Sequence, residues 1–417
     1  MASPVPEKVD VGSSTWIGTD EYEDDGEFAQ RANKFLQEIK WDRLTTICSE
    51  RRNVPCQLSE KFSIGHFNMV RQIGFQDGTL WIVRLRMPDL EEGAHLYPDV
   101  KRAMSSEVAC MNFLKAQSSI PVPEVYHFEP GSNDVGAPYI IMEYVHGTVA
   151  SEMQEKIDAP WNQFGTPEQD QKFRRKMAAI QVEMASLQFD KIGSLYQDAK
   201  TGGFYIGPDC QTGKGPWESS LEYYHSLAEQ KLEESTRNAP KEVQDDRSFN
   251  LPRLFQQLIP LYTEEKSVRG PFGLAHSDFG AHNLLVNEDF DILAVIDFDG
   301  LIAGPLEVQA QFPSLTGLDV EPPFAVETRP LVIARINATR PKLEEYKRMV
   351  QELERQTETP KGTHNPRKRP GDLLLSQASA LITGLQEYSM HQDFVNQKWM
   401  LSFERLLQEN TSRERCA

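Results

Sequence analysis

The sequence predicts an α+β protein with two lobes, a small N-terminal lobe built on an antiparallel sheet and a large, mostly helical C-terminal lobe. Two observations carry this prediction. Short apolar runs separated by turn signals fill residues 59–145, which is typical of strands. After residue 146 the apolar residues recur at helical spacing instead. The chain has 417 residues, which is enough to bury more than one core.

The domain organisation follows from these changes of pattern. Residues 1–26 are polar and acidic, and we expect them to form a disordered tail. Residues 27–58 are predicted to be a helical extension, and residues 59–145 the sheet-bearing lobe. Residues 146–417 are then the helical lobe.

Five strands and one helix are expected in the first lobe. The strands are predicted at residues 62–64, 69–75, 80–86, 122–128 and 138–144, with the helix at residues 100–117. Asp77-Gly78 is a strong turn signal and joins the second strand to the third.

The second lobe contains a clear amphipathic helix, whose apolar residues recur alternately four and three positions apart. We expect these residues to pack in the core: Phe173, Met177, Ile180, Met184 and Leu187. A further helix is expected at residues 341–356, with Pro341 at its first position. Residues 357–371 are Pro-rich and basic, which predicts an exposed loop, and helices are expected from residue 372 onward.

Composition narrows the class of function. The net charge of −18 argues against nucleic-acid binding, which needs a basic face. No apolar run is long enough to cross a membrane, and the N-terminal residues do not form a signal peptide, so we expect a cytoplasmic protein. The five cysteines are scattered, which favours reduced thiols without a disulfide framework. The acidity could favour a cationic substrate, or could serve solubility alone.

The most specific signal is a His-x-Asp-x-x-x-x-Asn motif that contains His276, Asp278 and Asn283 and runs into an apolar strand. Asp297 follows in an Ile-Asp-Phe-Asp segment. Two strands joined by residues 287–289 would bring Asp297 back beside Asn283.

These residue types match the chemistry of phosphoryl transfer from ATP. That reaction needs one carboxylate near the acceptor hydroxyl, and an Asn and a second carboxylate that hold Mg²⁺. Asp278 suits the first role, and Asn283 and Asp297 suit the second. Each residue alone could be a turn former, a cap or a strand-end acid, but their joint spacing favours the catalytic interpretation.

The two motifs resemble those of the aminoglycoside phosphotransferase and choline kinase group of small-molecule kinases, and more narrowly its fungal members with uncharacterised substrates. The resemblance covers about residues 59–313. It implies a protein-kinase-like fold and a Mg²⁺-dependent, ATP-dependent kinase that acts on a hydroxyl of a small molecule.

The resemblance also implies a nucleotide site in the first lobe. A phosphate-covering loop would include Gly65, Phe67 and Asn68. Arg84 stands where such kinases usually carry a Lys, with Glu107 as its partner, and Arg86 is a rival for the same role.

The segment between the lobes would border the adenine. By the same resemblance, Met142 would line the adenine pocket. The backbone carbonyl of Glu143 and the N–H of Val145 would hydrogen-bond to the base.

One alternative stays open beside the kinase hypothesis for small molecules. A protein kinase is disfavoured, because His-Ser-Asp replaces the usual His-Arg-Asp and no long activation segment follows Asp297. A pseudokinase-like binding module is favoured by Arg84 but opposed by the presence of all three residues Asp278, Asn283 and Asp297.

Overall fold

The structure is a computed structural model that describes residues 16, 18, 26–89, 99–157, 159–238, 250–357, 368–390 and 394–416. Most of the predicted tail, and residues 358–367 of the predicted exposed loop, lie outside the described residues. The chain divides into two compact units. The first comprises Met1–Ala159, Tyr196–Tyr205 and His282–Gly300, and the second comprises Pro160–Leu195, Ile206–Ala281 and Leu301–Ala417.

The first unit is built on the predicted antiparallel sheet, whose five strands run in the order β1-β2-β3-β5-β4. The strands are β1 (Cys56–Ile64), β2 (Asn68–Phe75), β3 (Leu80–Arg86), β4 (Val125–Glu129) and β5 (Tyr139–Glu143). Asp77-Gly78 forms the tight turn between β2 and β3, where Gly78 has a φ of +85° and the N–H of Thr79 donates to Asp77 Oδ1. The turn chemistry therefore sets the β2–β3 register.

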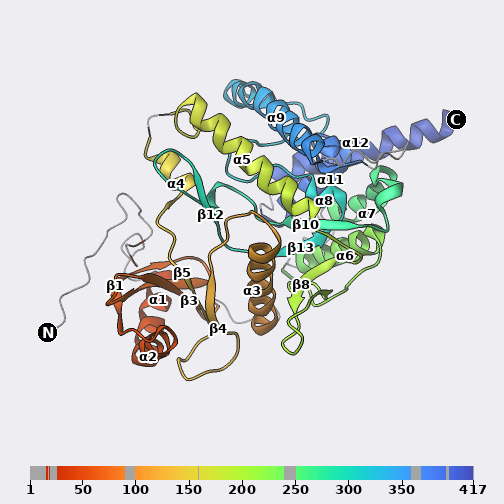
Figure 1. The fold of residues 1–417 in the computed structure, drawn as a ribbon. Helices are drawn as coiled ribbons and strands as arrows, with labels where there is room; N and C mark the ends of the chain where they lie inside the picture. Colours follow the sequence, from red (N-terminus) through yellow and green to blue (C-terminus); the bar gives the residue numbers. More distant parts are fainter. Residues whose placement is uncertain are drawn as a thin grey trace. The chain divides into compact units, whose positions relative to one another are not determined.

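Helices α1 (Glu27–Glu38) and α2 (Trp41–Arg52) cover one face of this sheet (Figure 1). Trp81, Val83 and Leu85 of β3 point into the core that these helices close. Because side chains alternate along a strand, Arg84 and Arg86 project from the opposite face. Helix α3 (Val100–Gln117) supplies Glu107 on that second side.

Two predictions for the N-terminal region were wrong in their bounds. The helical extension is two helices with a break at Ile39 and Lys40, and it ends at Arg52. Strand β1 begins at Cys56 instead of Phe62, because Ser59, Glu60 and Lys61 interrupt the apolar pattern and the pairing with β2 shifts register between Leu58 and Phe62. Such an irregularity hides the alternation that identifies a strand.

A second, three-stranded sheet completes the first unit. It contains β6 (Thr148–Val149), β11 (Leu284–Val286) and β12 (Ile292–Val295) in the order β12-β11-β6, and the short helix α4 (Ala150–Glu155) follows β6. Strands β11 and β12 pair antiparallel, with Leu284 opposite Val295. This hairpin is the one that the sequence predicts between Asn283 and Asp297.

The second unit combines a sheet with a helical core. Its sheet runs β7-β10-β13-β8-β9 and comprises β7 (Gln188–Phe189), β8 (Gly193–Gln197), β9 (Phe204–Gly207), β10 (Phe272–His276) and β13 (Leu301–Gly304). Its helices are α5 (Pro167–Ser186), α6 (Ser220–Asn238), α7 (Leu251–Tyr262), α8 (Leu306–Gln309), α9 (Pro330–Gln356), α10 (Pro370–Leu373), α11 (Gln377–Met390) and α12 (Phe394–Cys416).

Helix α5 buries the predicted apolar stripe, since Phe173, Met177, Ile180 and Met184 are all core side chains. Leu187 lies just past the helix end, as its C-cap. The placement of Pro341 at a helix start was wrong, because α9 begins at Pro330 and Pro341 lies inside it. The residues between these two prolines are mostly exposed, so no apolar period marks the first turns of α9.

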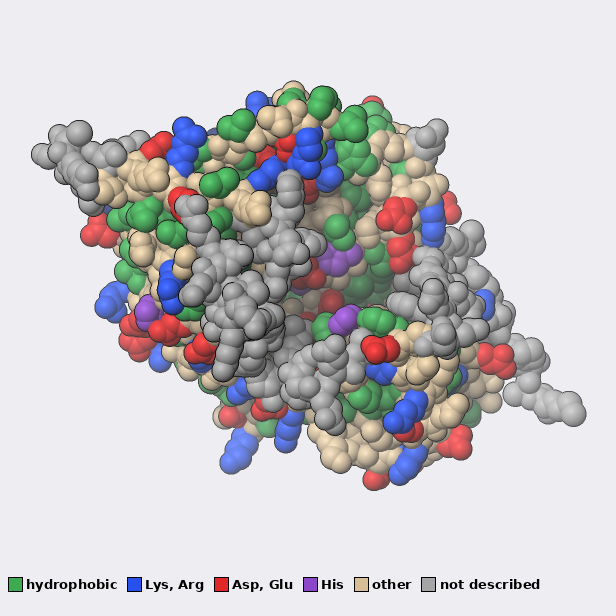
Figure 2. Space-filling view, turned by 180° about the vertical axis from the view of Figure 1, so that it is seen from behind, with side chains coloured by type: hydrophobic (Ala, Val, Ile, Leu, Met, Phe, Trp, Pro, Cys, Tyr) green, Lys and Arg blue, Asp and Glu red, His purple; other side chains and the backbone are tan. Residues whose placement is uncertain are grey.

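The described surface carries charges of both signs. Figure 2 shows Lys and Arg side chains in several separate places on the face that it draws, with Asp and Glu side chains between them. Within the described part of the chain, none of the helices combines the length and apolar character needed to cross a bilayer.

Candidate functional site

Asn283 and Asp297 lie side by side at the open end of the β11–β12 hairpin. Asn283 directly precedes β11, and Asp297 stands two residues after the end of β12. The backbone N–H of Ile296 donates to the carbonyl of Asn283 at 3.0 Å, which extends the pairing to these positions. The hairpin therefore positions the two predicted metal ligands together.

The two side chains differ in exposure. Asn283 is buried, and its Nδ2 lies 3.1 Å from His282 Nε2. The side chain of Asp297 is 45% exposed, and its backbone has a φ of +60°. Asp and Asn enter this left-handed region more readily than most residues. The turn thus presents the Asp297 carboxylate to solvent from a fixed backbone.

Arg84 joins two acidic side chains of the first unit. Its Nη2 is hydrogen-bonded to Glu107 Oε2, and its Nη1 lies 3.3 Å from Asp297 Oδ1. Burial alone would lower the pKa of Arg84, but Glu107 and then Asp297 outweigh it, so its pKa is raised. Burial also raises the pKa of Glu107, while Arg84 opposes that change. Arg84 is therefore a buried cation that compensates the charge of the buried Glu107 and also contacts Asp297.

Arg86 leaves β3 on the same side and contacts other groups. Its guanidinium lies 3.6 Å from Asp89 and 4.6 Å from the ring centre of Phe67. The ion pair with Glu107 thus belongs to Arg84, whereas the alternation along the strand left both arginines possible. The roles of Arg84 and Arg86 toward a nucleotide stay predictions.

Asp299 is a further acidic residue here, to which sequence reasoning assigned no role. Burial raises its pKa to about 6, while Arg84 and Arg86 act in the opposite direction. Its position as the second Asp of the Ile-Asp-Phe-Asp segment was the available signal. Asp299 therefore adds a third carboxylate to the surroundings of the two arginines.

The turn between β1 and β2 holds the predicted phosphate loop. The N–H of Gly65 donates to the carbonyl of Asn68 at 2.9 Å, which closes the turn. The carbonyl of Phe67 accepts the N–H of Met87 at 2.9 Å, and Arg31 of α1 donates to the carbonyl of His66 at 2.7 Å. A side chain at Gly65 would meet nothing within 4 Å. The loop is thus anchored at Phe67 and open at Gly65, and its contact with phosphates stays a prediction.

The end of β5 carries the predicted adenine-binding residues. Met142 is buried, and the N–H of Glu143 donates to the carbonyl of Glu124 at 2.8 Å. Within the described ranges, the N–H of Val145 makes no hydrogen bond. A backbone donor without a partner suits a hydrogen-bonding ligand. Adenine binding by Met142, Glu143 and Val145 stays a prediction.

Asp278 belongs to the second unit and follows β10. Its backbone N–H donates to His276 Nδ1 at 3.3 Å, and its side chain is exposed. The carbonyl of Phe279 accepts the N–H of Ser314 at 2.8 Å, which holds the loop after Asp278. Gly273 lets β10 pack closely, since a Cβ there would lie 2.3 Å from the carbonyl oxygen of Ala185.

The residues beside Arg84 fit a magnesium ion. Mg²⁺ prefers oxygen ligands and is usually held by one or two carboxylates together with substrate phosphates. Asn283 and Asp297 offer an amide oxygen and a carboxylate in one place. The described residues contain no group of three or more His, Cys, Asp and Glu side chains that could hold a metal alone. A metal here would therefore take its other ligands from phosphates and water.

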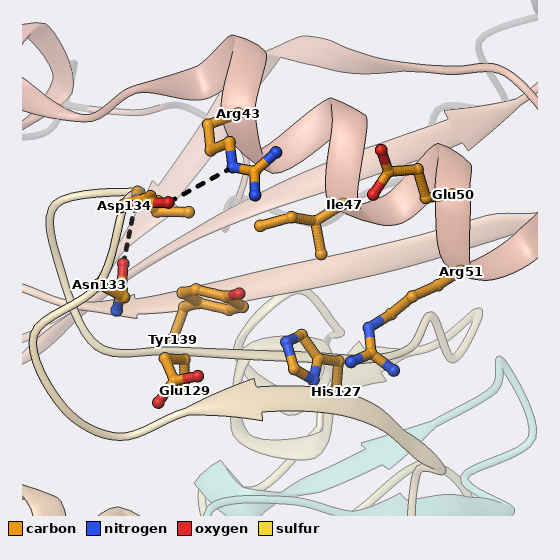
Figure 3. A pocket seen from close by; sticks show the side chains of 10 residues that line it. Arg43, Ile47, Glu50, Arg51, His127, Glu129, Asn133, Asp134 and Tyr139 are labelled. Atoms are coloured by element: carbon orange, nitrogen blue, oxygen red, sulfur yellow. Dashed lines mark hydrogen bonds and ion pairs between the residues drawn. The ribbon is translucent and has the colours of Figure 1, made fainter.

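The first unit also has a cavity of about 420 Å³, which contains none of the predicted site residues (Figure 3). Arg43, Ile47 and Arg51 of α2 line it on one side, and His127 and Tyr139 line it on the other. Its lining also includes Glu50, Glu129 and Asp134, so it carries charges of both signs.

A comparison with protein families shows to which family this chain belongs. The family described as the phosphotransferase enzyme family matches residues 72–308, more than half of the chain. This chain belongs to the phosphotransferase enzyme family. The matched segment contains Arg84, Glu107, Asp278, Asn283 and Asp297.

Two proteins with sequences similar to this chain come from fungi. A subtelomeric hrmA-associated cluster protein of Aspergillus fumigatus is 32% identical over 142 residues, which is 34% of this chain and 25% of that protein. The protein called altered inheritance of mitochondria protein 9, mitochondrial, of Kluyveromyces lactis is 25% identical over 270 residues, 49% of this chain and 42% of that protein. The chain thus spans less than half of the length of these relatives. A cytoplasmic location stays a prediction.

A solved structure shows the fold of the family. A protein of Ralstonia eutropha JMP134, assigned as an aminoglycoside phosphotransferase, aligns with a TM-score of 0.52 and 14% identity. The alignment covers 88% of this chain and 99% of that protein. The kinase-like α+β fold predicted from the sequence is confirmed.

Proposed function

We propose that this phosphotransferase is a kinase that transfers the γ-phosphoryl group of ATP to a hydroxyl of a small molecule and requires Mg²⁺. The observation that carries the proposal is the meeting of Arg84, Glu107 and Asp297, with Asn283 beside Asp297. Arg84 comes from β3 and Glu107 from α3. Asn283 and Asp297 come from the open end of the β11–β12 hairpin. Phosphoryl transfer depends mainly on such positioning and on neutralising charge.

Arg84 takes the place of the usual lysine in this proposal. Its planar guanidinium has several donors, so it can hold Glu107 and still present N–H groups to phosphate oxygens. The contact of Arg84 with Asp297 links the phosphate-binding cation to the metal ligand. Bound Mg²⁺ would supply a positive charge that offsets the phosphates, with Asn283 and Asp297 as its protein ligands.

Asp278 would serve the acceptor. Its exposed carboxylate follows a buried strand and precedes Asn283 by five positions, as the motif requires. It would accept or orient the proton of the attacking hydroxyl. The proposal rests for this residue on the motif, whose spacing matches that of the catalytic loop.

The acceptor is proposed only as a small molecule with a hydroxyl group. A cationic acceptor gains no support from Asp170, because Asp170 Oδ2 lies 3.0 Å from Arg174 and 3.2 Å from Lys342. Those two cations already compensate this carboxylate. The other acidic residues of the predicted substrate region, Glu152 and Glu155 of α4 and Glu168 of α5, leave the question open.

The decisive experiment measures thermal stabilisation by ATP with and without Mg²⁺. A ligand that binds only the folded state raises the melting temperature, and its stabilisation of that state grows with the logarithm of the ligand concentration above the Kd. We expect a Mg²⁺-dependent shift in the wild type, and we expect Asp297→Asn to remove that part of the shift. Asn suits the left-handed backbone, so the fold should be retained.

Asp289→Asn on the turn of the same hairpin is the matched control, because it makes the same chemical change at an exposed position. It should keep the wild-type shift. A wild type that is folded yet shows no shift at millimolar ATP with Mg²⁺ would contradict the proposal. Labelled γ-phosphate followed into a mixture of metabolites then identifies the acceptor.

A further inference from the structure

Cys48 and Cys56 bring two thiols together on the side of the sheet that α1 and α2 cover. Cys48 belongs to α2 and is fully buried, and Cys56 is the first residue of β1 and is half-buried. Both are free thiols in this structure. In the sequence they are two of five scattered cysteines, and neither belongs to a CxxC motif.

The contacts of Cys56 fix its sulfur over one face of α2. The Cys56 thiol donates to the carbonyl of Thr45 at 3.4 Å, and its sulfur lies 3.2 Å from Ser49 Oγ. The backbone N–H of Cys56 also donates to Ser49 Oγ at 3.2 Å. Thr45, Cys48 and Ser49 share a helix face, because residues three and four apart are neighbours. Cys48 lies on that same face, and its side chain belongs to the apolar core against which Cys56 packs.

The pKa values of the two thiols are shifted in opposite directions. The hydrogen bond from Cys48, together with that from Ser49, lowers the pKa of Cys56 to about 7, although burial opposes this. The pKa of Cys48 is raised by the same hydrogen bond and by burial. Near neutral pH Cys56 is thus partly a thiolate, and Cys48 is a neutral thiol beside it. Reactive cysteines are low in pKa and accessible, often next to a second, resolving thiol.

We propose that Cys48 and Cys56 are a modification site, an oxidation-sensitive thiol pair that a hydroperoxide converts reversibly into a disulfide joining α2 to β1. The Cys56 sulfur attacks one peroxide oxygen, the O–O bond breaks, and a sulfenic acid forms while the leaving hydroxide takes a proton to become water. The Cys48 sulfur then loses its proton and attacks the Cys56 sulfur, and the S–O bond breaks to release a second water. Two thiols lose two electrons, and one hydroperoxide gains them.

The surroundings allow this change with local movement. A disulfide has an S–S bond of about 2.05 Å, so the two sulfur atoms must move together to form it. The connecting residues are a turn in which Asn53 adopts a φ of +57°, and the turn is part of neither element. The other charged or titratable groups that act on the pair are Arg51 of α2, which lowers the pKa of Cys48, and Tyr139 of β5. Arg51 and Tyr139 both line the cavity of Figure 3, and Cys56 is the half-buried member of the pair through which solvent reaches it.

The test uses the full chain with Cys416→Ser, which removes the cysteine nearest the chain end, and a small molar excess of hydrogen peroxide. Free thiols are then alkylated and the peptides are analysed by mass spectrometry. We expect a Cys48–Cys56 linked peptide that disappears after treatment with a dithiol reductant. Its rate of formation should rise about tenfold per pH unit below pH 7 and level off above it, because the thiolate is the nucleophile.

Single substitutions distinguish the proposed roles of Cys56, which reacts with peroxide, and Cys48, which attacks the resulting sulfenic acid. Cys48→Ala should leave a sulfenic acid on Cys56 that dimedone traps, whereas Cys56→Ala should leave Cys48 reduced. Cys110→Ala, which alters a buried cysteine of α3 in the same unit, should form the disulfide at the wild-type rate. The oxidised protein should melt at a higher temperature than the reduced one, because the bond restricts the unfolded chain.

Three outcomes would overturn the proposal. One is a folded protein in which Cys56 stays reduced under peroxide that oxidises it in the urea-unfolded chain. Another is a sulfenic acid on Cys56 that persists although Cys48 is present. The third is a disulfide that links other cysteines. The wild-type peptide map alone decides the question if a variant fails to fold.

Discussion

Replacing Arg84 with Met tests whether the ion pair at the centre of the proposed site is a buried structural unit. The side chains of Arg84 and Glu107 are 13% and 6% exposed, whereas that of Asp297 is 45% exposed. Removing one member of a buried pair costs about 3–5 kcal/mol, because the other charge is left uncompensated. The pair with Asp297 is largely solvated and adds little. We therefore expect Arg84→Met to lower the free energy of unfolding by about 3 kcal/mol, chiefly through Glu107.

The free energy of unfolding that Arg84→Met removes should be smaller at low pH than at high pH. Burial already raises the pKa of Glu107, and Arg84 is what opposes it. Without Arg84 the pKa rises further, so the folded state holds a proton more tightly than the unfolded state does. Stability is then regained as the pH falls. The destabilisation caused by Arg84→Met should be smaller at pH 5 than at pH 8.

A double-mutant cycle by calorimetry measures this coupling. Arg84→Met, Glu107→Gln and the double variant should be non-additive by about 2 kcal/mol, because each single change removes the same interaction. Arg175→Met is the matched control, since its partner Glu352 lies 3.1 Å away in an exposed pair. We expect it to cost at most about 1 kcal/mol. Additive effects, or an Arg84→Met variant as stable as the control, would refute the reasoning.

Three further predictions concern single residues. Asp278→Asn should lower the single-turnover rate of phosphate transfer by about 10²–10⁴-fold while ATP affinity, measured by calorimetric titration, barely changes; equal rates would remove Asp278 from the chemistry. Gly65→Ala should leave the melting temperature unchanged, because a Cβ there meets nothing, yet weaken MgATP binding if this loop covers the phosphates. Burial raises the pKa of Glu354 to about 7 from 4.5, so its contribution to stability is lost as pH rises through 7. Glu354→Gln should be more stable than the wild type at pH 8 by up to about 3 kcal/mol but equal near pH 4, as pH-dependent melting would show.

Local patterns in the sequence predicted the turn and the hairpin that frame the candidate site, but not the contacts between distant segments. The Asp-Gly turn and the hairpin after Asn283 depend on local chemistry, so short-range patterns were sufficient for them. Alternation along β3 predicts that Arg84 and Arg86 share a face, but it does not distinguish between them. The pairing of Arg84 with Asp297 joins positions far apart in the chain, and only the folded sheets bring them together.

The elements that sequence reasoning missed have one cause in common. The first half of β1 and the first turns of α9 show no apolar period that identifies them, because β1 changes register after Leu58 and the start of α9 is mostly exposed. Their positions are set by pairing and packing with distant segments, which overrides local propensity. The contact between Cys48 and Cys56 is hidden in the same way, since it depends on how α2 packs beside the start of β1.

The left-handed backbone of Asp297 limits which substitutions this position can accept during evolution. Only Gly, Asn and Asp enter that region at low cost, and other residues pay about 1–2 kcal/mol. A lineage that lost the carboxylate proposed here to bind the metal, while keeping the fold, would therefore be expected to carry Asn or Gly at this position more often than Ala or Ser. Comparing the residue found here across a wide set of family members would thus separate chains that abandoned catalysis from chains that lost the fold as well.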